Sequence, residues 1–144
     1  MRAVIFDLDG TLIDAAPDIA AKLNVVITEA GHPALSLETV HGMIGDGAKV
    51  LVERAFAFYG QPAQPAQLER FMALYGVDPV KHTVIYDGII PALEALRAQG
   101  RPLGICTNKP MHATREVLAA LDLNRFFGAV LGGDCLLYTS DAAD

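Results

Sequence analysis

The sequence predicts an α/β fold in which a parallel sheet is interrupted, after its first strand, by a block of helices. Two observations predict it. In the second half of the chain, short apolar segments that end in polar residues alternate with helical segments, as in βαβ units. Between residue 15 and about residue 80, every regular segment instead has the periodicity of an amphipathic helix. With 144 residues, 52% of them hydrophobic and 19% charged, the chain can form a globular domain with an insert.

Three segments are predicted to be the strands of this Rossmann-like sheet. AVIFD (residues 3–7) is short and rich in branched and aromatic side chains, which is typical of a buried parallel strand. RPLGICTN (101–108) and GAVLGGD (128–134) are the second and third such segments. Helices predicted over residues 87–100 and 111–123 connect them, so the sheet is built from βαβ units.

The inserted block is predicted to be wholly helical. Its first helix begins near Pro17, a residue that suits the first turn of a helix, and ends at Gly31. Ser36 is the expected N-cap of the next helix. Asp14 and Asp18, near the start of the block, are expected to be solvated acids. The further helices are predicted over residues 36–45, 48–60 and 67–76.

Composition and charge argue against several classes of protein. The formal net charge is −6 and no block of Lys or Arg stands out, which argues against a nucleic-acid surface. No apolar run is long enough for a membrane span, and Asp7 and Asp9 interrupt the one candidate for a secretory leader. The two cysteines, Cys106 and Cys135, make no disulfide framework, so we expect a reducing, cytoplasmic setting. The oligomeric state stays open.

Two carboxylates follow the first predicted strand. Asp7 and Asp9 are two positions apart, so their side chains point the same way on an extended segment. Ligands of parallel sheets bind beyond the carboxyl ends of the strands, and crowded carboxylates suit Mg²⁺. With the metal bound, one carboxylate can attack phosphorus while the other carries a proton. The alternative is that both acids are simply solvated at the end of a strand. This alternative is weaker because the apolar strand and the D-x-D-G-T motif occur together.

The segment FDLDGTLID (6–14) resembles the first motif of the haloacid dehalogenase-like hydrolase superfamily of phosphotransferases. The resemblance implies that Asp7 is the nucleophile and Asp9 the general acid/base. It also implies Mg²⁺ bound by the side chain of Asp7 and the backbone carbonyl of Asp9. Gly10 and Thr11 would belong to the phosphate-binding loop. An acid at the second position argues against the dehalogenase branch of the superfamily.

The segment ICTNKP (105–110) resembles the second motif of the same superfamily. The family ends its second strand in Ser or Thr, so Thr107 is expected to hold a phosphoryl oxygen. Asn108 can donate a hydrogen bond to the same group from its side chain or backbone. Donors fixed around the phosphoryl oxygens stabilise the charge of the transition state. Lys109 either supplies positive charge near the phosphate or points into solvent.

The helical block resembles the small α-helical cap that the family inserts at this point. The resemblance divides the chain into an incomplete core (residues 1–14 and 83–134), a cap (15–82) and a non-native tail (135–144). A Gly-Asp-Gly turn of the cap would face the active site, and closure of the cap would exclude water. Lys49, just after that turn, either meets a carboxylate of the substrate or is a solvated lysine.

The implied reaction is hydrolysis of a small phosphorylated metabolite through an aspartyl-phosphate on Asp7. Together with TNKP (107–110), the segments MIGDGAKVLVERA (43–55) and ALYGVDP (73–79) resemble those of one phosphatase branch of this family, and the resemblance implies 2-phosphoglycolate as the substrate. Within the family, the alternative is a phosphatase or phosphomutase for sugar phosphates, because substrate choice lies in the cap. From another class, the alternatives are a non-catalytic module that holds Mg²⁺ or phosphate, and an assembly artefact without function. Neither a nucleic acid nor a membrane is expected as a partner.

The last ten residues, CLLYTSDAAD (135–144), depart from the family pattern. Translated back into codons, they resemble a transposase adapter used in sequencing libraries, so we expect native coding to end near Asp134. The lysine and the acidic pair that complete the family's site would follow that point. We therefore expect this chain by itself to have little or no activity, and its first strand to be an apolar edge prone to aggregation.

Overall fold

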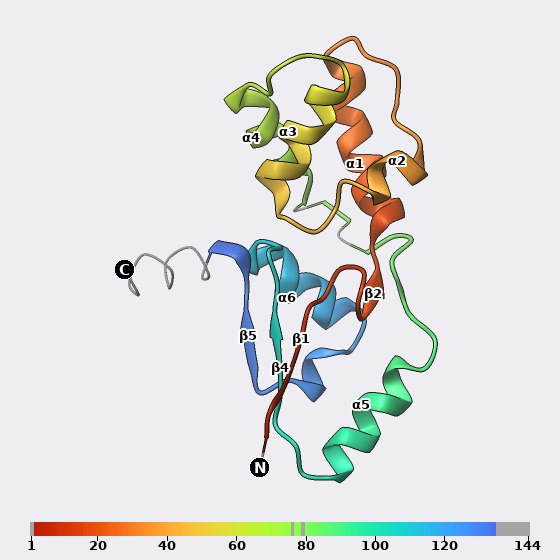
Figure 1. Ribbon diagram of the computed structural model, residues 1–144, viewed down its shortest axis with the longest axis vertical. Coiled ribbons are helices and arrows are strands. Elements are labelled where there is room, and N and C mark those ends of the chain that lie inside the picture. Colours follow the sequence, from red (N-terminus) through yellow and green to blue (C-terminus); the bar gives the residue numbers. More distant parts are fainter. Residues whose placement is uncertain (1, 76, 79, 135–144) are drawn as a thin grey trace. The chain divides into compact units, whose positions relative to one another are not determined.

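The computed structural model describes residues 2–75, 77–78 and 80–134, so the predicted tail (135–144) lies outside the described residues. The chain forms two compact units. Among the described residues, the α/β unit holds those up to Asp14 and from Val84 onward, and the helical unit lies within Ala15–Thr83. Figure 1 labels most of the strands and helices of both units, and the α/β class expected from the sequence is confirmed.

The three predicted strands form one parallel sheet in the α/β unit. In the register, Ile5 lies opposite Gly104, and Gly104 lies opposite Ala129. Because the strands are parallel, their carboxyl ends meet at one edge of the sheet, where ligands of such folds bind. The strands are β1 (Val4–Phe6), β4 (Leu103–Cys106) and β5 (Ala129–Leu131), in the order β1-β4-β5.

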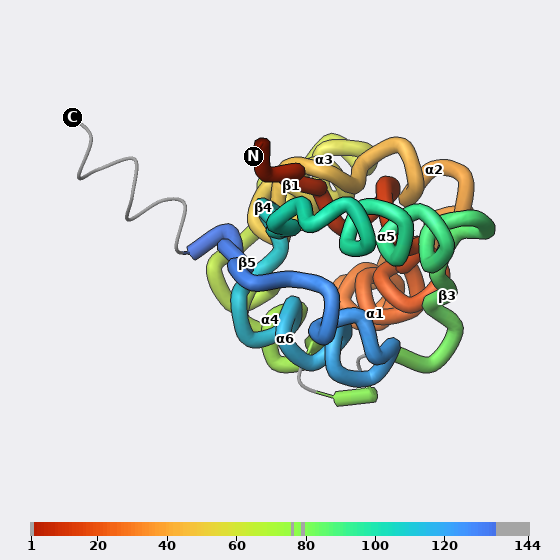
Figure 2. The backbone as a smooth tube through the Cα atoms, turned by 90° about the horizontal axis from the view of Figure 1, so that it is seen from below, coloured from red at the N-terminus to blue at the C-terminus, as the bar shows by residue number. Residues whose placement is uncertain are grey.

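Helices connect the strands and bury one face of the sheet. After the inserted segment, the backbone in Figure 2 passes through α5 (Ile89–Ala98), β4, α6 (Met111–Ala120) and β5 in this order. A short 3₁₀ helix, η1 (Asn124–Phe126), packs against both α5 and α6. Apolar side chains of the helices and of β4 form the core of this unit; they include Leu93, Leu103, Ile105, Val117 and Leu118.

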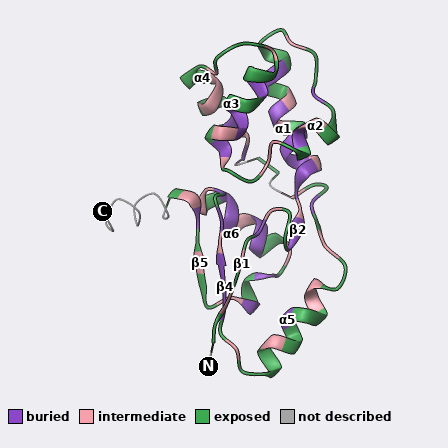
Figure 3. Cartoon of the chain, in the orientation of Figure 1, coloured by how far each residue is buried: buried purple, intermediate pink, exposed green. Residues whose placement is uncertain are grey.

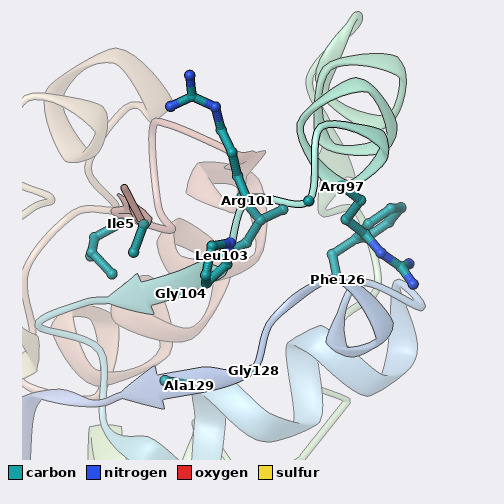
Figure 4. Close-up of a pocket in the computed structure, with 11 residues that line it drawn as sticks. Ile5, Arg97, Arg101, Leu103, Gly104, Phe126, Gly128 and Ala129 are labelled. Atoms are coloured by element: carbon teal, nitrogen blue, oxygen red, sulfur yellow. The ribbon is translucent and has the colours of Figure 1, made fainter. Parts of the chain in front are cut away.

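A groove of about 590 Å³ is lined by residues of all three strands together with Arg97 of α5 and Phe126 of η1 (Figure 4). Ile5, Gly104 and Ala129 lie in one row along it, because residues opposite each other in the register of neighbouring strands point to the same face of the sheet. The side chain of Ile5 is apolar and the residue is 61% exposed, so this face of the described sheet is largely uncovered.

A short antiparallel pair of strands was not predicted from the sequence. In β2 (Ile13–Asp14) and β3 (Val84–Ile85), Ile13 lies opposite Ile85 and Asp14 opposite Val84. Two residues per strand are too few to show a periodicity, which explains why no pattern identified them. The pair holds Asp14 beside Val84, so the inserted segment leaves and re-enters the α/β unit at one place.

The helical unit contains the four predicted helices. α1 packs against α2, α3 and α4, and Figure 3 shows buried residues along these helices. The Oγ of Ser36 accepts a hydrogen bond from the N–H of Thr39, which confirms its role as the N-cap of α2. No helix among the described residues is both long and apolar enough to cross a membrane. The bounds are α1 (Ala16–Glu29), α2 (Leu37–His41), α3 (Ala48–Phe58) and α4 (Pro65–Tyr75).

Asp18 is buried, and the expectation that it is a solvated acid was wrong. Its carboxylate accepts hydrogen bonds from the backbone N–H groups of Lys81, His82 and Thr83 at 2.8–3.0 Å. The hydroxyl of Thr83 donates a further bond at 2.6 Å. Burying a carboxylate is unfavourable unless such donors surround it. Asp18 therefore ties the first turn of α1 to the last residues of the helical unit.

Candidate active site

The two aspartates follow β1 in a tight turn. The carbonyl oxygen of Leu8 accepts hydrogen bonds from the N–H groups of residues 11–13, at 3.2, 3.0 and 3.3 Å. Gly10 has a φ of 81°, in the left-handed region that favours glycine. Leu8 and Leu12 are fully buried. These leucines anchor the turn, so Asp7 is presented at the surface beyond the end of the strand.

Asp7 and Asp9 have different surroundings. Asp7 is exposed, and its Oδ1 accepts a hydrogen bond from the N–H of Leu8 at 2.7 Å. The side chain of Asp9 is only 14% exposed, and its two carboxylate oxygens lie 3.2 and 3.1 Å from the Nζ of Lys109. Lys109 thus points to Asp9 and not into solvent. The ion pair joins the turn after β1 to the turn after β4, across 100 residues of sequence.

Thr107 and Asn108 directly follow β4. Thr107 is buried, and its backbone N–H donates to the carbonyl oxygen of Leu131 at 3.0 Å. The Oγ1 of Thr107 accepts a hydrogen bond from the backbone N–H of Lys109 at 3.2 Å. Asn108 is exposed. A hydroxyl that accepts one hydrogen bond can still donate its own proton, so Thr107 has the capacity that its predicted role requires.

The segment Gly132–Asp134 holds the turn after β4, a contact that was not foreseen from the sequence. The N–H of Gly133 donates to the carbonyl oxygen of Lys109 at 2.8 Å. The Oδ1 of Asp134 accepts from the backbone N–H of Met111 at 3.0 Å, at the start of α6. The chain after β5 therefore braces the turn that carries Thr107, Asn108 and Lys109.

The two glycines of this segment are required by close backbone contacts. A Cβ added to Gly133 would lie 2.2 Å from the carbonyl oxygen of Asn108. A Cβ added to Gly132 would lie 2.6 Å from the Cα of Met111. Paired glycines at the end of an apolar strand were the available signal, because glycine in such a place often marks close backbone approach.

Lys49 lies in the helical unit, in the first turn of α3. Its side chain is 76% exposed, and its Nζ is 4.0 Å from the Oε1 of Glu53, one turn later. The turn before the helix is held by Arg54, which lies 2.6 Å from the carboxylate of Asp46 and donates to the carbonyl oxygen of Met43. Asp46 therefore has a structural partner within its own unit. The contact of Lys49 with a substrate stays a prediction.

The donor set at the end of β1 fits a magnesium ion. Within the described part of the chain, no three His, Cys, Asp or Glu side chains are grouped so as to hold a metal together. Mg²⁺ does not need such a group, because it keeps several waters and commonly uses one or two carboxylates plus a substrate phosphate. The exposed carboxylate of Asp7 is a hard oxygen donor of this kind. Together with the backbone carbonyl of Asp9, it would form the share of such a site that the described residues supply.

Comparison with known proteins identifies the class to which this fold and site belong. The family model of haloacid dehalogenase-like hydrolases matches residues 4–137, which include the turns of Asp7 and Thr107. The chain therefore belongs to the haloacid dehalogenase-like hydrolase family.

Similar curated proteins carry a more particular name, phosphoglycolate phosphatase. One from Cereibacter sphaeroides is 43% identical over 140 residues, which cover 94% of this chain and 64% of the relative. One from Rhodospirillum rubrum is 42% identical over 143 residues, which cover 94% of this chain and 59% of the relative. The chain thus spans less than two thirds of the length of these relatives.

Solved structures share the fold. A crystal structure of a Haemophilus somnus protein, described as a predicted phosphoglycolate phosphatase, matches with a TM-score of 0.83 at 31% identity, over 92% of this chain and 63% of that one. A Clostridium acetobutylicum protein described as a predicted phosphatase matches with a TM-score of 0.79 at 24% identity, over 91% of this chain and 60% of that one. The second likeness concerns the fold alone.

Proposed function

We propose that the protein hydrolyses phosphomonoesters of small metabolites in a Mg²⁺-dependent reaction, with 2-phosphoglycolate as its substrate. The observation that carries the proposal is the exposed carboxylate of Asp7 at the carboxyl end of β1, next to a second acid, Asp9. Family membership and the name of the relatives, phosphoglycolate phosphatase, support it. Because the chain spans less than two thirds of those relatives, the activity of the whole protein is itself part of the proposal.

In the first step, a carboxylate oxygen of Asp7 attacks the phosphorus atom. Asp9, ion-paired with Lys109 in the described structure, has to take up a proton with the substrate before this step. The bond from Asp7 to phosphorus then forms while the bond from phosphorus to the ester oxygen breaks, and Asp9 gives that proton to the ester oxygen. Hydrogen-bond donors around the phosphoryl group stabilise the charge that its oxygens carry in the transition state. We assign this binding role to Gly10, Thr11, Thr107 and Asn108.

In the second step, water attacks the phosphorus of the aspartyl-phosphate. The water gives a proton to Asp9, the bond between Asp7 and phosphorus breaks, and inorganic phosphate leaves. Both acids then have their starting protonation, so the net reaction is hydrolysis of the ester. Mg²⁺, held by the Asp7 carboxylate and the Asp9 backbone carbonyl, would supply positive charge that screens the attacking carboxylate from the phosphate.

The proposed substrate carries a carboxylate in addition to its phosphate. Lys49, with an exposed ammonium in the helical unit, is the ligand that we propose for that carboxylate. A neutral sugar phosphate has no such group, so substrate preference separates this function from that of a sugar-phosphate phosphatase or phosphomutase. We place the reaction in the cytoplasm, a reducing compartment in keeping with the free thiol of Cys106.

The proposal is tested by measuring turnover by a longer gene product. This protein contains residues 4–134 of the present sequence unchanged and has the length of the phosphoglycolate phosphatase relatives. Phosphate release is measured from 2-phosphoglycolate and from glucose 6-phosphate, with Mg²⁺ and with EDTA. We expect hydrolysis that prefers 2-phosphoglycolate, that EDTA stops, and that Asp7→Asn lowers by about 10³-fold or more. Asp87→Asn, which changes an exposed acid outside both turns, is the matched control. Full turnover by Asp7→Asn would refute the mechanism.

A further inference from the structure

Lys109 is a buried lysine beside the proposed acid/base. Its side chain is 3% exposed, and its Nζ lies 3.1 and 3.2 Å from the two carboxylate oxygens of Asp9. Burial of an ammonium is unfavourable without a nearby counter-charge. The contact is therefore a buried ion pair, and removing either partner would leave the other charge buried without a counter-charge. The exposed ion pairs on the surface of the chain do not have this property.

Hydrogen bonds hold both the backbone N–H and the backbone carbonyl oxygen of Lys109. Its N–H donates to the Oγ1 of Thr107 at 3.2 Å. Its carbonyl oxygen accepts from the N–H of Gly133 at 2.8 Å and from the hydroxyl of Thr114 at 3.3 Å. With both backbone groups engaged, the residue has few alternative conformations, so the ammonium is presented to Asp9 from a fixed position.

This ion pair makes the two neighbouring carboxylates chemically different. Asp7 is exposed and accepts a hydrogen bond from the adjacent N–H of Leu8. Both oxygens of Asp9 instead face an ammonium that already balances their negative charge. A divalent cation near the end of β1 is therefore attracted to the carboxylate of Asp7, while Lys109 repels it from that of Asp9.

We propose that Lys109 is a positioning residue that reserves the carboxylate of Asp9, so that a divalent cation is bound by the carboxylate of Asp7 and not by that of Asp9. The inference rests on the proposed function only in treating the end of β1 as a metal site. It explains how two acids that both suit Mg²⁺ keep separate roles. The side chain of Asp9 stays off the metal and remains available to the ester oxygen.

Binding of Mn²⁺ to the 144-residue chain tests the inference, with free Mn²⁺ measured by electron paramagnetic resonance. Lys109→Met removes the ammonium and keeps an apolar side chain in the buried position. We expect it to bind Mn²⁺ about tenfold more tightly or better, the size of effect that neighbours of metal ligands commonly have. Lys109→Arg keeps the charge and should retain the original affinity. Lys81→Met, at an exposed lysine, controls for the change in net charge and should also retain it.

An Mn²⁺ affinity of Lys109→Met that is equal to or below the original, in protein with an unchanged circular dichroism spectrum, overturns the inference. If Lys109→Met does not fold, Lys109→Gln provides the same comparison. Adding Asp9→Asn to Lys109→Met should remove the gain; a gain that persists would mean that the new ligand is not Asp9, which also overturns it. No readout here requires phosphatase activity. A tighter Mn²⁺ site in Lys109→Met, combined with no turnover by the gene product at the length of its relatives, would refute the proposed function alone.

Discussion

Asp18 connects the first turn of α1 to the last residues of the helical unit through a single carboxylate. Burial raises the pKa of this group. Hydrogen bonds from the hydroxyl of Thr83 and from the backbone N–H groups of His82, Lys81 and Thr83 together lower the pKa by more than burial raises it. The pKa of folded Asp18 therefore lies below its ordinary value. The ionised carboxylate is therefore the form that stabilises the folded unit.

Removing this carboxylate should destabilise the chain in a pH-dependent way. Asp18→Ala leaves three backbone N–H groups without their acceptor, and we expect it to lower the free energy of unfolding in urea by about 3 kcal/mol at neutral pH. Because the folded pKa is depressed, the contribution is complete above the pKa of an unfolded aspartate, about 3.9, and is lost as the pH falls through the folded pKa. The difference in the free energy of unfolding between Asp18→Ala and the original chain should therefore shrink over that acidic range.

Asp87→Ala is the control for this experiment, because Asp87 is also an acid but lies exposed. It should change the free energy of unfolding by no more than about 0.5 kcal/mol. A difference between Asp18→Ala and the original chain that stays constant into strong acid would contradict the role of the ionised carboxylate.

At the scale of elements, the turn after β4 depends on the segment after β5. Gly133 donates to the carbonyl of Lys109, and Asp134 accepts from the N–H of Met111. Three residues with proposed roles, Thr107, Asn108 and Lys109, thus share one support that lies more than twenty residues later. The hydrogen bonds of the segment after β5 stabilise the turn after β4. The segment therefore affects the site only through the position of that turn.

A methyl group at Gly133 should disrupt this support. Gly133→Ala would place a Cβ 2.2 Å from a backbone oxygen, and because backbone cannot rotate away as a side chain can, we expect a loss of about 1–3 kcal/mol in the free energy of unfolding. Gly128→Ala is the matched control, since a Cβ there would meet nothing within 4 Å. Thermal or urea unfolding measures both, and equal stability of the two variants would show that the turn can shift without cost.

At the scale of the whole chain, the described sheet leaves an apolar face and an edge strand open. β1 lies at one edge of the order β1-β4-β5. Ile5 of β1 is 61% exposed and Leu131 of β5 is 45% exposed. Figure 4 shows Ile5 among the residues that line the groove. Exposed apolar strands at a sheet edge promote pairing between chains.

A charge on this face should therefore reduce self-association of the chain. We expect Ile5→Lys to lower the oligomeric fraction seen by sedimentation velocity at micromolar concentration, the range in which open apolar edges aggregate. Val77→Lys introduces the same charge at an apolar residue that is 59% exposed outside the sheet, so it controls for the change in net charge. If Ile5→Lys and Val77→Lys associate to the same extent, self-association does not occur through this face of the sheet.

The sequence by itself determined the parallel strands, the connecting helices and the four helices of the insert. It also located Asp7, Asp9 and Thr107 at strand ends. These features could be predicted because periodicity and turn residues are local: a helix or strand shows in the spacing of the side chains that it buries. The motif after β1 is local too, since Gly10 and two buried leucines shape the turn by themselves.

Only the tertiary structure decided which partners the polar groups have. Asp9 and Lys109 are 100 residues apart, and Asp18 lies 63 to 65 residues from its donors. No periodicity connects such positions, because the contact forms only when separate segments pack against each other. The same holds for β2 and β3, whose two-residue strands have no pattern of their own. Whether a charged side chain is solvated or buried is therefore set by the fold around it, as Asp18 and Lys109 both show.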